Sequence, residues 1–295
     1  MTDTPAPLRM RSWLFAPGDS DKKMTKAADS DADIALFDLE DSVTPENKPE
    51  ARERVAAMIA SRDDKHRLWV RVNPLSSGWT GDDLAAIMPS CPGGIFLPKS
   101  DGGHDVETLD TMLAECETEA GLATGSTKVA ALVTETAAAM FTTGTYAGTP
   151  RLVAMSWGAE DLSSELGAQE QRGPDGEYTH VFEMARSLCL LGAVKAQVAP
   201  IETVQPEFRD LDALRERALR VRRQGFRGML AIHPAQIEPI NTAFTPSPEE
   251  LDHARAVVRA FADNPGAGTV ALDGNMLDRP HLALAQRILA EAGVS

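Results

Sequence analysis

Short apolar runs recur eight times along the chain, and stretches with helical spacing of apolar and charged residues separate them. Runs of this length that are rich in strand-forming residues predict buried strands. Alternating strands and helices predict parallel βα units, and eight such units fit a closed α/β barrel, the (β/α)8 TIM barrel, better than an open sheet. The predicted strands are "SWLFAP" (12–17), "IALFDL" (34–39), "RLWVRV" (67–72), "GIFLPK" (94–99), "KVAALV" (128–133), "RLVAMSW" (151–157), "KAQVAPI" (195–201) and "MLAIHP" (229–234).

The length of 295 residues accommodates one barrel of about 250 residues and an extension. We therefore expect a catalytic barrel domain over residues 1–245 and a C-terminal helical extension, or lid, over residues 246–295. The Gly-rich stretch "PGAGTVALDGN" in this extension is predicted to act as a hinge or to let the extension reach another subunit. The sequence has no GxGxxG after the first strand and no GxxxxGK[ST], so neither nucleotide-binding motif is present.

The composition argues against several classes of protein. The formal net charge is −15 and the sequence pI is about 4.8, so binding to nucleic acid or to an anionic membrane is not expected, because each needs a basic surface. No apolar run reaches the length of a signal peptide or a membrane span, and we expect a cytoplasmic protein. Cys91, Cys116 and Cys189 are widely spaced and are expected to be reduced thiols.

Polar residues stand at the C-terminal ends of most predicted strands. In a TIM barrel these ends carry the active site, so their side chains are candidate site residues. Acids outnumber bases among them, which favours a bound divalent cation, and the lone histidine is expected to be a hydrogen-bonded structural residue. The candidates are Asp38, Glu40, Asp41, Arg71, Asn73, Lys99, Glu135, Glu160, Asp161 and His233.

Glu135 and Asp161 are the candidate metal ligands, because they follow neighbouring strands and each could offer one oxygen to a shared ion. Two carboxylates completed by water and substrate oxygens are a usual arrangement for Mg²⁺. Alternatively, each acid caps the helix after its strand, where negative charge is favoured.

Arg71, in "RVNP", would point a planar double donor at the same end of the barrel, which suits a substrate carboxylate. It could instead pair with Asp38, Glu40 or Asp41, and the two kinds of contact can coexist. The "GAED" segment is predicted to open a helix, and its backbone N–H groups would form a cradle for a carboxylate or a developing oxyanion.

Ten motifs occur in order along the chain: "RSWLFAPG", "DIALFDLEDSV", "RVN", "LPK", "TE", "SWGAEDL", "APIETV", "GFRGMLAIHPAQIEPIN", "FTPSPEE" and "DGNMLDRPHLALAQ". Together they resemble the CitE-like family, the citrate lyase β-subunit group within the HpcH/HpaI aldolase superfamily. The resemblance covers residues 11–293.

The resemblance implies a Mg²⁺-dependent barrel, with Mn²⁺ as an alternative ion, that cleaves or forms a carbon–carbon bond in a CoA thioester. The substrate would be a 3-hydroxyacyl-CoA such as malyl-CoA, citramalyl-CoA or citryl-CoA, and the products acetyl- or propionyl-CoA and an oxo acid. The resemblance makes Glu135 and Asp161 the metal ligands and Arg71 the arginine that grips the oxo-acid carboxylate. The implied amide cradle consists of Gly158, Ala159 and Glu160.

Asp278, in "MLDRP", looks like the aspartate that a neighbouring subunit's C-terminal lid supplies as acid and base, and the resemblance implies a homotrimer or a hexamer. Two positions depart from the family pattern. Glu202 stands where an Asp is common, and Met229 where a Lys is common. Both departures put the identity of the substrate in question.

Four cations near the first strand are candidates for binding the CoA phosphates: Arg11, Lys22, Lys23 and Lys26. They could equally be solvated charges on helices.

The acids after the second strand cannot all face one ion, because Asp41 has the opposite strand parity to Asp38 and Glu40. We assign Glu40 and Asp41 to orienting Arg71 and metal-bound water. Asp38 is expected to be structural.

Three functions remain open at this point. The first is a Mg²⁺-dependent 3-hydroxyacyl-CoA lyase. The second is a malyl-CoA thioesterase on the same scaffold, and the third is a noncatalytic subunit of a citrate-lyase-like assembly.

Overall fold

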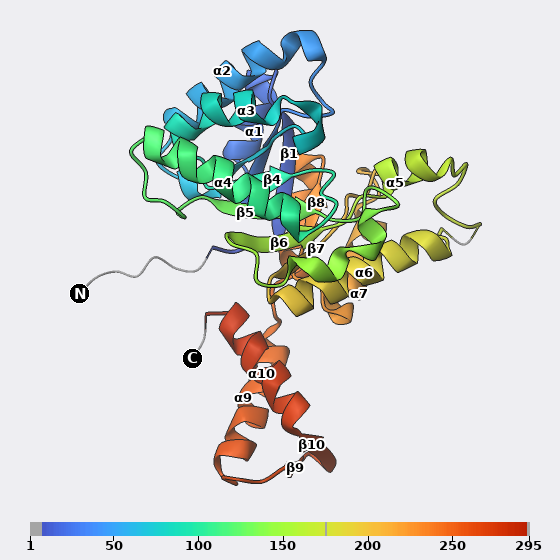
Figure 1. The fold of residues 1–295 in the computed structure, drawn as a ribbon. Coiled ribbons are helices and arrows are strands. Elements are labelled where there is room, and N and C mark those ends of the chain that lie inside the picture. The colour runs from blue at the N-terminus through green and yellow to red at the C-terminus, as the bar shows by residue number, and fades with distance from the viewer. Residues whose placement is uncertain (1–7, 175, 294–295) are drawn as a thin grey trace. The chain divides into compact units, whose positions relative to one another are not determined.

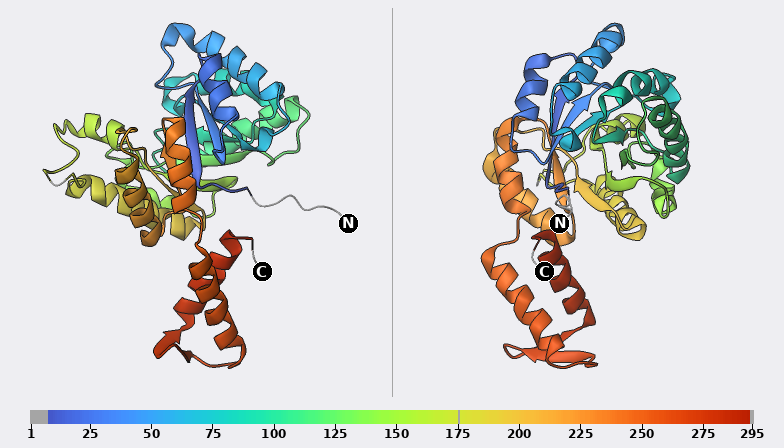
Figure 2. Two further views of the ribbon diagram at one scale, coloured as in Figure 1. Left: turned by 180° about the vertical axis from the view of Figure 1, so that it is seen from behind. Right: turned by 90° about the vertical axis from the view of Figure 1, so that its left-hand side faces the viewer.

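The computed structural model describes residues 8–174 and 176–293. Eight parallel strands form a closed barrel in the order β1 to β8, and helices surround it on the outside (Figure 1; Figure 2). The predicted (β/α)8 barrel is therefore confirmed. The barrel strands are β1 (Ser12–Pro17), β2 (Ile34–Asp38), β3 (Leu68–Arg71), β4 (Gly94–Leu97), β5 (Lys128–Leu132), β6 (Leu152–Ser156), β7 (Ala199–Glu202) and β8 (Gly228–Ala231).

Helices of seven or more residues fill most of the connections between strands, while short 3-10 helices alone lie between β5 and β6. The helices are α1 (Asp21–Ala28), α2 (Lys48–Ala60), α3 (Thr80–Ile87), α4 (Gly103–Glu119), α5 (Ala159–Leu166), α6 (His180–Ala196), α7 (Leu211–Gln224), α8 (Ile237–Ala243), α9 (Pro248–Ala262) and α10 (Arg279–Glu291). No helix in the described part of the chain is long and apolar enough to cross a membrane.

The seventh strand is displaced from its predicted place at 195–201. Helix α6 continues to Ala196, and its C-cap residue Gln197 has a left-handed backbone with a φ of 60°. The strand then runs over Ala199–Glu202. The acid Glu202 is consequently the last residue of a barrel strand.

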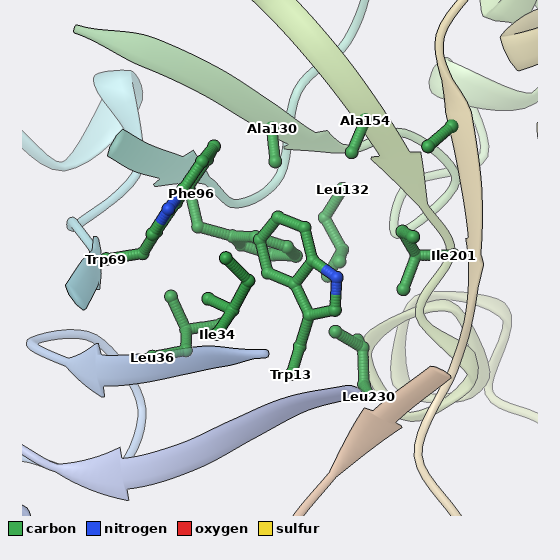
Figure 3. Close-up of a cluster of buried hydrophobic side chains, with 11 residues drawn as sticks. Trp13, Ile34, Leu36, Trp69, Phe96, Ala130, Leu132, Ala154, Ile201 and Leu230 are labelled. Carbon is green, nitrogen blue, oxygen red and sulfur yellow. The ribbon is translucent and has the colours of Figure 1, made fainter. Parts of the chain in front are cut away.

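The inside of the barrel is filled by large and small side chains that fit against one another (Figure 3). Trp13 lies edge-on to Trp69 with ring centroids 5.0 Å apart. Gly94 lies so close to this cluster that a Cβ on it would come within 2.6 Å of the Trp69 ring. The packing makes the barrel interior a solid core, which supports the strand ends above it.

The chain divides into two compact units, residues 1–241 and 242–295. In the second unit an antiparallel hairpin of β9 (Thr269–Leu272) and β10 (Asn275–Asp278) connects α9 to α10. The Gly-rich connection expected at this place is therefore partly a β-hairpin. Asp273 and Gly274 form its turn with φ angles of 51° and 80°. An Asp-Gly pair between strands is a strong signal for such a turn.

Candidate active site

A pocket of about 700 Å³ lies at the C-terminal ends of the barrel strands. Its wall combines acids, cations and apolar side chains, and it includes most of the residues that the sequence singled out. Glu40, Asn73, Lys99 and Arg11 are not among its lining residues. The predicted residues that line it are Lys22, Lys23, Lys26, Asp38, Asp41, Arg71, Glu135, Gly158, Ala159, Glu160, Asp161 and His233.

Arg71 is held chiefly by Asp38. The two residues are direct neighbours in the register of β2 and β3, and Nε and Nη2 of Arg71 donate to the two carboxylate oxygens of Asp38 at 2.7 and 2.8 Å. Glu40 adds an oxygen 2.9 Å from Nη1, whereas Asp41 lies 4.0 Å away. The ring of Phe15 packs against the guanidinium at 4.8 Å. Asp38, expected to be only structural, is therefore the main partner that orients Arg71.

The pKa of Asp38 shows how strong this pairing is. Burial raises the pKa of the carboxyl, but the charge and hydrogen bonds of Arg71, with further hydrogen bonds from Ser42 and the Glu40 backbone, lower it to about 2. The pKa of Arg71 is likewise raised by Asp38 and Glu40 in spite of its burial. Both groups are charged at neutral pH.

Lys99 connects acids from several strands, a role that the sequence did not reveal. It follows β4 with a left-handed φ of 48°, which is strained for a residue with a side chain. Its backbone N–H donates to Oε2 of Glu135 at 2.5 Å. Its Nζ lies 2.5 Å from Oε1 of Glu40 and 3.1 Å from Oδ1 of Asp161. The pKa of Lys99 is raised because these acids outweigh its partial burial.

The negative charge of Glu135 is only partly compensated by its neighbours. This residue is only 2% exposed, and its pKa is raised well above the usual range by burial and by the negative charges of Asp161 and Glu40. A bound cation would remove this cost, and carboxylate oxygens are the ligands that Mg²⁺ prefers. The residues present therefore fit a Mg²⁺ ion at Glu135 and Asp161.

Two carboxylates alone do not fill the coordination sphere of a metal ion. No group of three or more His, Cys, Asp and Glu side chains that could hold an ion occurs among residues 8–174 and 176–293. Mg²⁺ commonly takes one or two protein carboxylates and fills its other positions with water and substrate oxygens.

The Gly158–Asp161 segment opens helix α5, with Gly158 as the N-cap residue. A Cβ on Gly158 would lie 2.8 Å from Cγ of Glu135, so the backbone approaches that acid as closely as only glycine permits. The side chain of Glu160 points to another partner, since it accepts a hydrogen bond from Gln171 at 2.8 Å. The backbone of this segment, beside Glu135, is the feature suited to binding an anion.

The candidate CoA cations do not lie together. Lys22, Lys23 and Lys26 belong to α1 and line the pocket. Arg11 precedes β1 at the opposite end of the barrel, and its Nε and Nη2 donate to the carboxylate of Asp33 at 2.9 and 2.8 Å. The position of Arg11 explains this difference, since only the C-terminal ends of the strands face the pocket.

The two departures from the family pattern also lie outside the pocket lining. Glu202 and Met229 are fully buried and are register neighbours on β7 and β8. His233 does line the pocket, and it caps a short helix by accepting from the N–H of Ala235 at 3.2 Å while its ring stacks on Phe208.

Asp278 belongs to the second unit, where it caps helix α10. Its Oδ1 lies 2.5 Å from Nδ1 of His281. Hydrogen bonding to His281 lowers the pKa of Asp278, so the carboxylate is ionised at neutral pH.

Comparison with known proteins agrees with this architecture. The family model described as HpcH/HpaI aldolase/citrate lyase matches residues 11–234. The chain belongs to this family. The earlier resemblance to its CitE-like members is thereby confirmed.

Relatives in the HpcH/HpaI family align with nearly the whole chain. A (3S)-malyl-CoA thioesterase of Cereibacter sphaeroides is 32% identical over 96% of this chain and 94% of its own. A citrate lyase subunit beta-like protein of Mycobacterium tuberculosis is 34% identical over 95% of each chain. The crystal structure of CitE from M. tuberculosis with magnesium, acetoacetate and coenzyme A has a TM-score of 0.80 and 32% identity, and the match covers 97% of this chain and 98% of that one.

Proposed function

We propose that the protein is a Mg²⁺-dependent carbon–carbon lyase that acts on a 3-hydroxyacyl-CoA. The observation that carries this proposal is the pair Glu135 and Asp161 at the strand ends, one of them buried with a raised pKa. Arg71 lines the same pocket. Membership of the HpcH/HpaI family, and relatives named for citrate lyase and malyl-CoA, support the choice of substrate class.

In this proposal Glu135 and Asp161 hold Mg²⁺. When bound, the ion polarises the substrate oxygens and favours loss of the hydroxyl proton. Arg71, rigidly paired with Asp38, binds the carboxylate of the oxo-acid half through its remaining N–H groups. The backbone N–H groups at Gly158–Glu160 bind the same half.

The reaction breaks the bond between the carbon next to the thioester and the hydroxyl-bearing carbon. The hydroxyl gives up its proton and becomes the carbonyl of the oxo acid. The electron pair of the broken bond passes to the carbon next to the thioester, which then takes a proton. The ionised Asp278 of a neighbouring subunit is proposed to remove that proton in the bond-forming direction and, once protonated, to return it in cleavage. Residues 246–295 would act as the lid that excludes water.

Lys22, Lys23 and Lys26 are proposed to bind the phosphates of CoA, because they line the pocket on a single helix. Mn²⁺ is proposed as a substitute for Mg²⁺, and a cytoplasmic homotrimer or hexamer as the working form.

A malyl-CoA thioesterase is the second candidate, because relatives at 32% identity carry that name. It would use the same pocket, but water would attack the thioester carbonyl and the hydroxy acid would leave intact. The third candidate, a noncatalytic subunit, is disfavoured because both carboxylates and Arg71 line one pocket.

Product analysis separates these functions. The purified protein is incubated with Mg²⁺ and malyl-CoA, citramalyl-CoA or citryl-CoA, and free thiol and oxo acid are measured in parallel, with Glu135→Gln as the control variant. Oxo acid without free thiol is the expected result. Free CoA with malate and no oxo acid would establish the thioesterase instead, and no product from any of the three would contradict both enzymes.

A further inference from the structure

One buried carboxylate outside the pocket contacts residues that line it. Glu202, the last residue of β7, is fully buried. Its Oε1 accepts a hydrogen bond from the indole Nε1 of Trp157 at 2.9 Å and another from the backbone N–H of Thr203 at 3.1 Å. Trp157 and Thr203 both line the pocket. A single oxygen atom therefore joins the ends of β6 and β7.

Two arginines from the helices outside the barrel hold this carboxylate in place. Nη2 of Arg217 on α7 donates to Oε1 of Glu202 at 2.8 Å, and Nη1 of the same arginine donates to the carbonyl of Val204 at 3.1 Å. Nε of Arg186 on α6 lies 3.8 Å from Oε2. The side chains of Arg217 and Arg186 are only 6% and 8% exposed. Because separating buried opposite charges is costly, the network gives Glu202 one fixed position.

Trp157 links Glu202 to the candidate site. It directly precedes Gly158, and its indole lies edge-on to Tyr178 with centroids 5.0 Å apart. Gly158 in turn has no free space on the side of Glu135, whose Cγ would be 2.8 Å from an added Cβ. A displacement of Trp157 would therefore press the start of α5 against Glu135 or draw it away.

We propose that Glu202 is a positioning residue, which fixes the Gly158–Asp161 segment beside Glu135 through its hydrogen bond to Trp157. The role of that segment rests on the proposed function. The mechanical link itself does not, so it can be tested without catalysis.

The variant Trp157→Phe removes the N–H donor and leaves the Glu202–Arg217 pair intact. Trp69→Phe is the matched control, because Trp69 is also fully buried and donates one hydrogen bond, to the carbonyl of His66 at 3.3 Å, without lining the pocket. Amide hydrogen exchange is measured by mass spectrometry on the metal-free, full-length proteins. Residues 157–166 should exchange at least about fivefold faster in Trp157→Phe than in the control.

Steady-state kinetics and Mg²⁺ titration provide the second readout. Trp157→Phe should lower kcat about tenfold, as is typical for loss of a residue that orients a metal site, and weaken Mg²⁺ binding similarly. KM for the thioester should change less than about threefold, because the proposed contacts between the α1 lysines and the CoA phosphates are unchanged. Glu202→Asp keeps the charge but is one methylene shorter, and it should show the same pattern.

The proposal is overturned if Trp157→Phe and Glu202→Asp match Trp69→Phe in exchange over 157–166 and in Mg²⁺ affinity. A wild-type protein without lyase or thioesterase activity would contradict the proposed function. In that case the exchange comparison would still decide the positioning role.

Discussion

Two acids at the same end of the barrel have opposite electrostatic situations. Asp38 is neutralised by Arg71, and its pKa falls to about 2. Glu135 is buried, and its burial together with the negative charges of Asp161 and Glu40 raises its pKa. Lys99 is shared among these acids and compensates them only in part. One carboxylate is thus satisfied by the protein, and the other provides the physical reason for a cation.

The Asp38–Arg71 pair should make the fold sensitive to acid. A pKa lowered in the folded state stabilises the protein above the unfolded value of 3.8, and this stabilisation is lost as the pH falls toward about 2. The shift corresponds to about 2 kcal/mol. Urea unfolding between pH 5 and pH 2.5 should therefore show most of that loss in the wild type, and Asp38→Asn should lack it. Parallel pH curves for the two proteins would contradict this.

Gly158→Ala should damage the site by contact rather than by backbone strain, because its φ of −123° suits any residue. The new methyl group would meet Glu135, and overpacking of this kind costs about 1–3 kcal/mol. We expect Mg²⁺ affinity, measured by calorimetry, to fall at least about tenfold. Gly81→Ala is the control, since its nearest neighbour would be 3.9 Å away. Equal affinities in the two variants would refute the expectation.

The sequence identifies site residues where position along a strand decides their place, and it fails where register or dihedral angles decide. Arg71 and Glu135 could be selected as strand-terminal residues. The pairing of Arg71 with Asp38 depends on the register of β2 and β3, and the contacts of Lys99 depend on its positive φ. Neither property is visible in the sequence.

At the level of elements, hydrophobic patterning predicted the eight barrel strands because each is a continuous apolar run. It placed the seventh too early, since the end of α6 is as apolar as the strand that follows. The β9–β10 hairpin is not predicted for a different reason. The glycines around it indicate a loop, and they outweigh the single Asp-Gly turn signal within them.

Gly274→Ala should loosen this hairpin, because Gly274 has a φ of 80° and a side chain there costs about 1 kcal/mol. Amides over 269–278 should exchange about fivefold faster, the factor that corresponds to 1 kcal/mol. Gly268→Ala is the matched control, since a Cβ there would meet nothing within 4 Å and it has no positive φ. Unchanged exchange in Gly274→Ala would show that the turn is not under this constraint.

At the level of the whole molecule, the proposed acid Asp278 and the proposed metal ligands belong to different compact units. The sequence could place the second unit after the eighth strand, but it could not say which subunit's pocket that unit serves. That depends on the assembly of several chains.

Mixing two inactive variants tests whether Asp278 acts on a neighbouring subunit. Glu135→Gln and Asp278→Asn should each lose at least about 100-fold in kcat as homo-oligomers. After subunit exchange at equal concentrations, a site is complete when its own chain has Glu135 and its neighbour has Asp278. Random assembly makes about a quarter of the sites complete, and lyase activity should recover to that level. No recovery after verified exchange would place Asp278 in its own subunit's pocket.

The closing pair of strands has a consequence for how the protein is made. Ser12 of β1 pairs with Met229 of β8, so the first barrel strand lacks one of its two partners until the last has been synthesised. Contacts between such distant segments form slowly, and the edges of β1 and β7 stay open until then. Folding on the ribosome should therefore depend on protection of β1 from pairing with other chains. The pocket has lining residues on both β1 and β8, so it is completed only when these two strands pair.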